Sequence, residues 1–185
     1  MEKNNDLALG IREYDFPEKL NKIIKDKLIN AEVFDWTNSG IGKNGVNTKV
    51  RSSKNYHFNH EDESIQRIKR YIYKCVDDYT RHYSISYTKN IDMNILKYSA
   101  GGQYLYHSDS DYNFYRTISV IIYINPAEYS GGETDFKFLN LKIKPKVPKL
   151  IVFPSNFIYT HAAFPVLEGE KYVIVGWLND VPEEV

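Results

Sequence analysis

The residues whose types and spacing could do chemistry begin with His107 and Asp109, which are separated by one serine. On an extended segment, alternate side chains point to the same face, so this imidazole and this carboxylate would converge on one side. His161 lies far along the chain, in a stretch of β-forming residues, and would be a third donor. Two histidines and one carboxylate on one face form the triad that binds non-haem Fe(II) and leaves adjacent coordination positions open. The alternatives are a solvated His-x-Asp loop and a buried histidine with a satisfied hydrogen bond.

Lys171 is the next candidate, because it stands at the start of the apolar run 172–177 (YVIVGW). If its ammonium group points inward, an anion must meet it, since an unpaired buried charge is costly. A co-substrate that carries a carboxylate would supply that partner. The alternative is a lysine at a strand end whose stem is buried while its head reaches solvent.

Other groups have simpler interpretations. His57, His60 and Glu61 would approach one another on one helical turn and form a rival metal cluster, but they lie in a polar stretch just before a helix start signal. We therefore favour a solvated helix start over a metal site. Cys75 falls in an apolar helical stripe and is expected in the core. A run of four lysines with two prolines, within 142–149, predicts a charged edge that discourages strand pairing, with a patch for an acidic substrate segment as the alternative.

The elements that must position these groups change character near residue 90. Before it, apolar residues repeat at helical spacing within 20–28, behind Pro17, and within 65–79, behind Asp62 and Ser64. The stretch between them is rich in Gly, Asn and Ser, which predicts loops and a short hairpin. After residue 90, short β-like runs alternate with turn residues, and we predict strands at 91–98, 104–107, 117–124, 133–138, 139–143, 149–153, 157–163 and 171–178. This succession is typical of a β-sandwich or jelly roll, with the helices covering one sheet from outside.

Composition excludes several classes of protein. A chain of 185 residues suits one domain, and 24 Lys+Arg against 24 Asp+Glu give no net charge that would attract nucleic acid or acidic membranes. There is no apolar run long enough to span a bilayer, and the acidic N-terminal stretch has no signal-peptide core. The single cysteine excludes an internal disulfide and a thiolate metal cage. We expect a soluble, cytoplasmic domain with no nucleic-acid partner and no membrane contact.

Four segments, in order, carry a resemblance to a known family: 98–109 (YSAGGQYLYHSD), 116–125 (RTISVIIYIN), 131–134 (GGET) and 161–177 (HAAFPVLEGEKYVIVGW). Together they closely resemble the Fe(II)- and 2-oxoglutarate-dependent dioxygenases of the prolyl 4-hydroxylase type. The resemblance implies a mainly β (α+β) fold, the double-stranded β-helix or jelly roll, with N-terminal supporting helices. It also implies one domain, 1–185, in which 1–89 supply helical support and a substrate loop at 38–60, and 90–180 form the catalytic core.

The resemblance implies a role for each matched residue. Three residues look like the iron ligands: His107, Asp109 and His161. Four would surround 2-oxoglutarate, with the first pairing with its distal carboxylate: Lys171, Tyr98, Ser119 and Tyr123. Three would contact substrate or close the pocket: Arg116, Tyr104 and Trp177. Two departures affect the details of co-substrate binding, because Asn179 replaces a frequent histidine and Ala162-Ala163 displaces a frequent glycine.

The implied cofactors are Fe(II), 2-oxoglutarate as co-substrate and O2, with ascorbate as reductant. The implied reaction decarboxylates 2-oxoglutarate to succinate and hydroxylates a prolyl residue of a peptide or protein. Aromatic residues of the expected substrate loop, with Trp36, Tyr56 and Phe58 among them, would suit an extended proline-rich chain. Two alternatives remain: the same chemistry on a free amino acid, nucleobase or other small molecule, and a jelly-roll binding module without catalysis. The sequence leaves the oligomeric state open.

Overall fold

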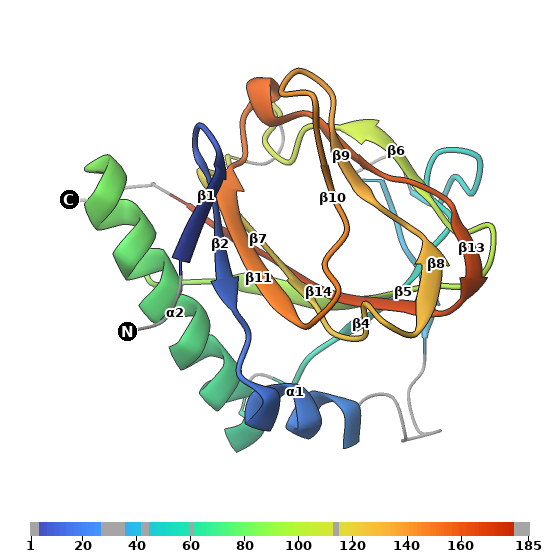
Figure 1. Cartoon of the computed structure of the whole chain (residues 1–185), viewed down its shortest axis with the longest axis horizontal. Helices are drawn as coiled ribbons and strands as arrows, with labels where there is room; N and C mark the ends of the chain where they lie inside the picture. The colour runs from blue at the N-terminus through green and yellow to red at the C-terminus, as the bar shows by residue number, and fades with distance from the viewer. Residues whose placement is uncertain (1–3, 27–35, 42–44, 60, 113–114, 180–185) are drawn as a thin grey trace.

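Two antiparallel sheets face each other across the interior of the protein in the computed structural model, which describes residues 4–26, 36–41, 45–59, 61–112 and 115–179 (Figure 1). The strands of the large sheet, in spatial order, are β1 (Asn4–Ala8), β2 (Ile11–Asp15), β11 (Lys149–Pro154), β7 (Ile118–Tyr123), β14 (Lys171–Leu178), β5 (Asp92–Tyr98), β4 (Lys54–His57) and β3 (Thr37–Asn38). Those of the small sheet are β10 (Leu141–Ile143), β9 (Thr134–Phe136), β12 (His161–Ala163) and β6 (Tyr104–His107). A separate hairpin pairs β8 (Tyr129–Gly131) with β13 (Val166–Gly169). This is the double-stranded β-helix, or jelly roll, that the sequence predicts.

The central strands of the large sheet are apolar on both faces because both faces are covered. In β7, Val120 and Ile122 belong to the core beneath the helices, whereas Ile121 and Tyr123 belong to the core between the sheets. The same alternation in β14 sends Val173 toward the interior between the sheets. The side-chain period of two therefore decides which residues can reach a site inside the barrel.

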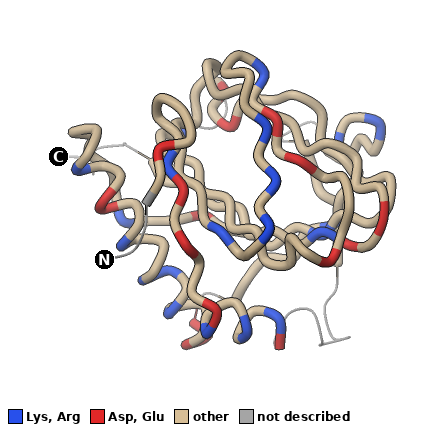
Figure 2. The backbone as a smooth tube through the Cα atoms, in the orientation of Figure 1, with Lys and Arg blue, Asp and Glu red and all other residues tan. Residues whose placement is uncertain are grey.

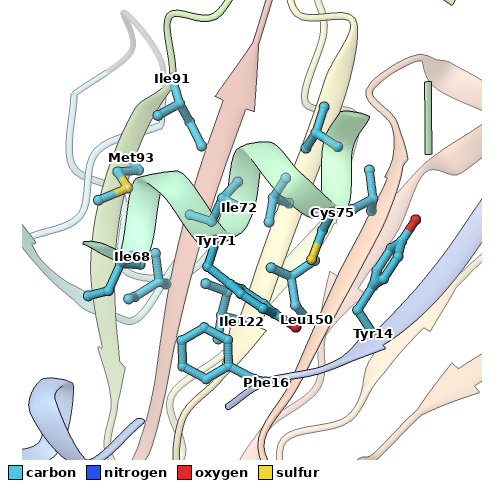
Figure 3. Packing of buried hydrophobic residues seen from close by; sticks show 14 of the residues in the cluster. Tyr14, Phe16, Ile68, Tyr71, Ile72, Cys75, Ile91, Met93, Ile122 and Leu150 are labelled. Carbon is cyan, nitrogen blue, oxygen red and sulfur yellow. The ribbon is translucent and has the colours of Figure 1, made fainter. Parts of the chain in front are cut away.

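Helix α2 (Glu63–Tyr83) crosses the outer face of the large sheet (Figure 3). It begins where the sequence predicts, since the side chain of Asp62 accepts a hydrogen bond from Ser64 N at 2.7 Å. Its apolar stripe packs against strand residues such as Ile122, and Cys75 is 1% exposed within that stripe. The core position predicted for Cys75 is confirmed.

Helix α1 (Glu18–Ile24) follows Pro17, which is the residue that precedes its first turn. The helical pattern predicted up to residue 28 runs beyond it, and residues 27–35 lie outside the described part of the chain. No helix in the described ranges is both long and apolar enough to cross a bilayer.

The sequence reading missed several short strands and misassigned one segment. Strands β1 and β2 come from the region expected to hold helices and loops, and β8 and β13 were not predicted, whereas β3 and β4 form the antiparallel pair of the short hairpin predicted between the two helical stretches. The segment predicted as a strand at 157–163 begins instead as a 3-10 helix, Phe157–Tyr159. Asn156 caps it by accepting from Ile158 N at 3.1 Å, and Phe157 is 72% exposed, so no sheet covers its side chain.

Lysines are spaced along β10 and the segment that follows it (Figure 2). Strand β10 is an edge of the small sheet, as the charged-edge interpretation predicts. Lys144 lies 3.2 Å from Glu133, and Lys149 pairs with Asp15 and Glu13. These ion pairs place two of the lysines in contacts within the fold.

Candidate active site

A cavity of about 420 Å³ lies between the two sheets. Its walls come from strands far apart in sequence, because the large sheet supplies β4, β5, β7 and β14 and the small sheet supplies β6, β9 and β12. The candidate residues that line it are His107, Asp109, His161, Lys171, Tyr98, Tyr104, Arg116 and Trp177. The fold therefore brings most of the predicted site residues to one place.

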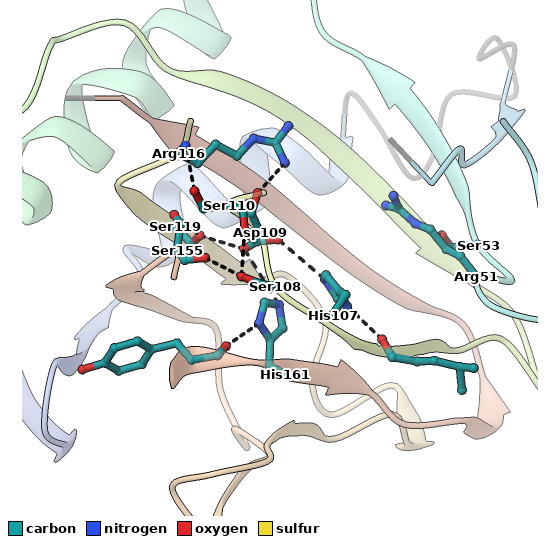
Figure 4. Close-up of polar contacts among 12 residues, drawn as sticks. Arg51, Ser53, His107, Ser108, Asp109, Ser110, Arg116, Ser119, Ser155 and His161 are labelled. Atoms are coloured by element: carbon teal, nitrogen blue, oxygen red, sulfur yellow. Dashed lines mark hydrogen bonds and ion pairs between the residues drawn. The ribbon is translucent and has the colours of Figure 1, made fainter. Parts of the chain in front are cut away.

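The two histidines are set opposite each other by the pairing of β6 with β12, in which His107 is the register partner of His161. The Nδ1 atom of His107 lies 2.9 Å from Leu105 O, and that of His161 lies 3.0 Å from Tyr159 O (Figure 4). A carbonyl oxygen only accepts, so each Nδ1 carries the proton and each Nε2 presents a lone pair. The Nε2 atoms of His107 and His161 lie 3.6 Å and 3.9 Å from the carboxylate oxygens of Asp109.

Two serine hydroxyl groups support the carboxylate of Asp109, the first through a direct hydrogen bond and the second through the first. Ser119 Oγ donates to Asp109 Oδ2 at 2.7 Å and lies 2.7 Å from Ser155 Oγ (Figure 4). The resemblance implied a contact between Ser119 and the co-substrate, but the structure places this hydroxyl on Asp109. Ser119 thus orients a candidate ligand, and Ser155 extends the support.

Burial and the neighbouring groups leave Asp109 and His161 in the protonation states that bind a cation. Burial alone would raise the pKa of Asp109, but His161, His107 and the hydrogen bond from Ser119 together lower that pKa well below its usual range. Burial is also the main reason why the pKa of His161 falls to about 4, with His107 lowering it further. At neutral pH the site therefore holds a carboxylate and a neutral imidazole, which are the protonation states that ligate metals.

The three donor groups fit Fe(II). Their ligand atoms all lie within 4.8 Å of one another, and two nitrogens with one carboxylate oxygen form the donor set of a facial triad. Within the described ranges, no other group of three His, Cys, Asp or Glu side chains is close enough to hold a metal. In the rival cluster, His57 Nε2 lies 3.0 Å from Asn55 Nδ2, and His60 lies outside the described residues.

Lys171 is 2% exposed, so the alternative in which its head reaches solvent is wrong. Its Nζ donates to Gly132 O at 2.7 Å, in the turn where Gly131 and Gly132 both have positive φ angles. A Cβ atom on Gly132 would lie 3.2 Å from Lys171 Cδ, so the glycine leaves room for the lysine stem. Burial lowers the pKa of Lys171 to about 7, while the charge of Glu133 opposes the shift. The site thus holds a buried amine whose charged form needs an anion.

Two tyrosine rings lie near this amine. Lys171 Nζ lies 5.3 Å from the ring centroid of Tyr98 and 5.8 Å from that of Tyr123. Tyr123 donates to Thr134 Oγ1 at 2.8 Å, and Thr134 itself lines the cavity. Burial raises the pKa values of Tyr98 and Tyr123, so both keep their protons at neutral pH. The structure therefore places both tyrosines near Lys171.

Arg116 and Trp177 form one side of the cavity. The guanidinium carbon of Arg116 lies 3.8 Å from the centroid of a Trp177 ring, and Nη1 donates to Asp109 O at 3.4 Å. Asp92 lies 3.8 Å from Arg116 Nη2. Burial lowers the pKa of Arg116, although the group stays charged at neutral pH because its pKa starts so high.

Two lining or supporting residues, Thr134 and Ser155, were not singled out by sequence reasoning, and Arg51 was expected only as a basic residue of the substrate loop. Thr134 stands in the GGET segment, but Arg51 lies in a polar stretch without periodicity and Ser155 follows a proline in a turn. Asn179 is exposed, and its carbonyl accepts from Thr88. Nothing in the described contacts links the Asn179 side chain to Lys171.

The expectation that Trp36, Tyr56 and Phe58 present aromatic surfaces to a substrate is wrong. Phe58 is a buried member of the core beneath the helices, and Trp36 and Tyr56 pack against that core. Strand alternation explains the error, because in β4 the neighbouring residues Asn55 and His57 are the ones that face the cavity.

The sequence profile of the 2OG-Fe(II) oxygenase superfamily matches residues 93–179, which contain the three candidate ligands and Lys171. This match supports a 2OG-Fe(II) oxygenase, and members of that superfamily are enzymes that use Fe(II), 2-oxoglutarate and O2. A protein of Acanthamoeba polyphaga mimivirus that is assigned as a prolyl 4-hydroxylase is 26% identical, over 89% of this chain and 70% of the viral protein. Two further curated relatives, from Prochlorococcus marinus and Arabidopsis thaliana, are matched over only 31% and 41% of their own lengths.

Solved structures share the fold. A prolyl hydroxylase from Trichoplax adhaerens, in complex with a peptide fragment of a hypoxia inducible factor, has a TM-score of 0.77 at 20% identity, over 92% of this chain and 84% of that one. A viral collagen prolyl hydroxylase from Paramecium Bursaria Chlorella virus-1, in complex with 2OG, has a TM-score of 0.69 at 22% identity, over 94% and 97%. These likenesses confirm the double-stranded β-helix.

Proposed function

We propose that this chain is an Fe(II)- and 2-oxoglutarate-dependent hydroxylase of prolyl residues in a peptide or protein. One observation carries the proposal: a facial set of two imidazoles and a carboxylate shares a cavity with a buried lysine. A metal ligated on one face, next to a cation that can meet a distal carboxylate, is the arrangement that a 2-oxo acid requires.

His107, Asp109 and His161 would hold the iron, which when bound supplies the activation of O2 and the oxidation of 2-oxoglutarate. The chain's own contribution is to fix these ligands. The β6–β12 register sets the two imidazoles, and Ser119 sets the carboxylate. The apolar wall formed by Phe136 and Phe153 next to His161 keeps bulk water from that side of the site.

Lys171 would pair with the distal carboxylate of 2-oxoglutarate. Its Nζ donates to Gly132 O, and an ammonium group has three protons to donate. The rings of Tyr98 and Tyr123 lie close to the ammonium group and carry no charge at neutral pH. A charge-assisted contact inside a buried site is strong, so this end of the cavity would select a dicarboxylate over a monocarboxylate.

The substrate would enter beside Arg116, Tyr104 and Trp177, which line the same cavity. A peptide leaves backbone carbonyls that Arg116 can bind, and the flat faces of tyrosine and tryptophan suit the ring of proline. The prolyl hydroxylases named above support a peptidyl proline and its C4 atom as the target. The segment 38–60 supplies Ser39, Arg51 and His57 to the cavity, and its closing over substrate stays a prediction.

The test is turnover with defined substrates. The protein is incubated with Fe(II), 2-oxoglutarate and ascorbate, together with poly-proline, collagen-like or Ser-Pro-rich peptides, and succinate and peptide mass are measured. We expect succinate formation coupled to the gain of one oxygen, with fragment mapping that places it on proline. Asp109→Ala should abolish both while keeping the thermal unfolding midpoint. Oxygen on another residue, or turnover with a free small molecule alone, would refute the prolyl assignment; no succinate with any substrate would favour the non-catalytic alternative.

The cellular location is a further part of the proposal. The cysteine, Cys75, is buried and free, which is compatible with a reducing compartment. We keep the cytoplasm as the proposed location, and imaging of a tagged chain in its host would test it.

A further inference from the structure

Three groups stack in a column that ends at a candidate metal ligand. The guanidinium carbon of Arg51 lies 4.6 Å from the centroid of the Tyr104 ring. The imidazole of His107 stacks on the same ring, with its centroid 3.6 Å away at an interplanar angle of 16°. Tyr104 is therefore placed between a cation and His107.

Arg51 is itself anchored to the polar segment before β4. Its Nη1 donates to Gly40 O at 2.9 Å and its Nε donates to Ser53 Oγ at 3.2 Å. Ser53 Oγ in turn lies 2.9 Å from Ser39 Oγ. These hydrogen bonds join Ser39 and Gly40 to Arg51 and Ser53 beside the cavity.

Backbone hydrogen bonds join this segment to β6. Ser52 N donates to Gln103 O at 2.8 Å, and Leu105 N donates to Val50 O at 2.9 Å. These two bonds flank Tyr104, which is also the bridge partner of Arg51. Backbone hydrogen bonds on both sides of the bridge therefore hold the segments that carry Arg51 and Tyr104 together. Figure 4 shows Arg51 beyond His107, on the side away from His161.

The two histidines differ in how their rings are held. The side chain of His161 is 7% exposed and packs against Phe136 and Phe153, with ring centroids at 5.5 Å and 5.1 Å. The side chain of His107 is 17% exposed, and Tyr104 covers one of its faces. The hydrogen bond to Leu105 O fixes one atom of His107, and the stacked ring is what restrains its plane.

We propose that Tyr104 and Arg51 are positioning residues for His107, and that they link metal affinity to the order of the segment around Arg51. This inference rests on the proposed function, because it assumes that His107 binds the metal. The link must act in both directions: a metal that holds His107 in place favours the stack, and the stack favours metal binding. Tyr104 and Arg51 thus act through His107, in addition to any contact with substrate.

The experiment measures binding of Co(II) alone, in the absence of 2-oxoglutarate and peptide, from its visible absorption. We expect Tyr104→Leu to weaken Co(II) binding about ten-fold and Arg51→Met about three- to ten-fold, since these are the sizes of aromatic stacking and cation–π contacts. Tyr104→Phe keeps the stack and should bind like wild type. Lys54→Met removes an exposed cation of the neighbouring strand as a matched control, and it should also bind like wild type.

Hydrogen exchange supplies the second readout, which a general loss of stability would not reproduce. Co(II) should slow the exchange of the Ser52 and Leu105 amides in wild type and in Tyr104→Phe, and should do so much less in Tyr104→Leu. Equal Co(II) affinity in Tyr104→Leu and Tyr104→Phe would overturn the inference while leaving the metal site standing. Wild-type protein that binds no Co(II), or that binds it as well after Asp109→Ala, would overturn the proposed function itself.

Discussion

Replacing Lys171 with methionine removes one charge from the interior and keeps most of the side-chain volume. The lysine is 2% exposed, its Nζ is bonded to Gly132 O, and burial lowers its pKa to about 7. A methionine at this position preserves the packing against Gly132 and Tyr98. The change therefore isolates the ammonium group from the stem that carries it.

The expected loss of 2-oxoglutarate affinity follows from the lost ionic contact. A hydrogen bond to a charged group is worth roughly 1.5–3 kcal/mol, which corresponds to about ten- to a hundred-fold in the dissociation constant. Binding of Co(II) should change little, because Lys171 is not among the three grouped donors. The free energy of unfolding of Lys171→Met at pH 6.5 should exceed that of wild type, because the buried cation destabilises the native state.

The pH dependence gives the sharper test. Because the pKa of Lys171 lies near 7, the amine of the free protein loses its proton above that pH, and a dicarboxylate must then restore it on binding. The dissociation constant of wild type should rise about ten-fold between pH 6 and pH 8. The ionisable groups around the amine do not titrate in this window: the pKa values of Tyr98 and Tyr123 are raised, that of Glu133 is lowered, and that of His161 is about 4.

The assay is calorimetric titration of 2-oxoglutarate into the cobalt-loaded protein, in buffers of different ionisation enthalpy. Wild type should take up a proton on binding at pH 8, whereas Lys171→Met should show no such uptake and a flat profile. Lys54→Ala, which changes an exposed lysine, is the control and should match wild type. Unchanged affinity in Lys171→Met would refute the assigned contact, and Arg116 would be the next cation to test.

Three further perturbations have defined outcomes. Ser119→Ala removes the donor to Asp109, and we expect Co(II) affinity to fall about ten-fold with little change in thermal stability; an unchanged titration would contradict the positioning role. Gly132→Ala places a side chain at a φ of +66° and 3.2 Å from Lys171 Cδ, so 2-oxoglutarate binding should weaken more than Co(II) binding, as calorimetry would show. Asp62→Ala removes the cap of α2 and should lower the free energy of unfolding by about 1 kcal/mol in urea titrations, with turnover per folded molecule unchanged.

Most residues of the candidate site could be predicted from the sequence, because they stand in short motifs with recognisable spacing. His107 and Asp109 alternate on an extended segment, and Lys171 begins an apolar strand whose bounds, 171–178, match the prediction. The sequence could not show how deeply each side chain is buried. The same Lys171 is compatible with a snorkelling side chain until the pairing of β14 between β5 and β7 buries it.

The missed features are those that local pattern does not encode. The bounds of strand β4 could not be predicted within the stretch where a hairpin is expected, because its cavity face carries Asn55 and His57 and the usual apolar alternation is absent. Phe157 and Ile158 have the composition of a strand, yet they are 72% and 45% exposed, and Asn156 starts a 3-10 turn instead. The column of Arg51, Tyr104 and His107 joins residues more than fifty positions apart, which only the fold brings together.

The position of β14 in the large sheet has a consequence for how the protein is made. The strand formed by Lys171–Leu178 lies between β7 and β5, and β2, near the start of the chain, pairs with β11. A ribosome must therefore synthesise the chain as far as Leu178 before the middle of the sheet can close. Until then β5 and β7 expose unpaired edges, which are templates for aggregation, and the contacts that complete the fold are the long-range ones that form slowly. We expect the nascent chain to depend on chaperones until residue 178 has left the ribosome, and any chain that stops before Lys171 to be degraded instead of accumulating without activity.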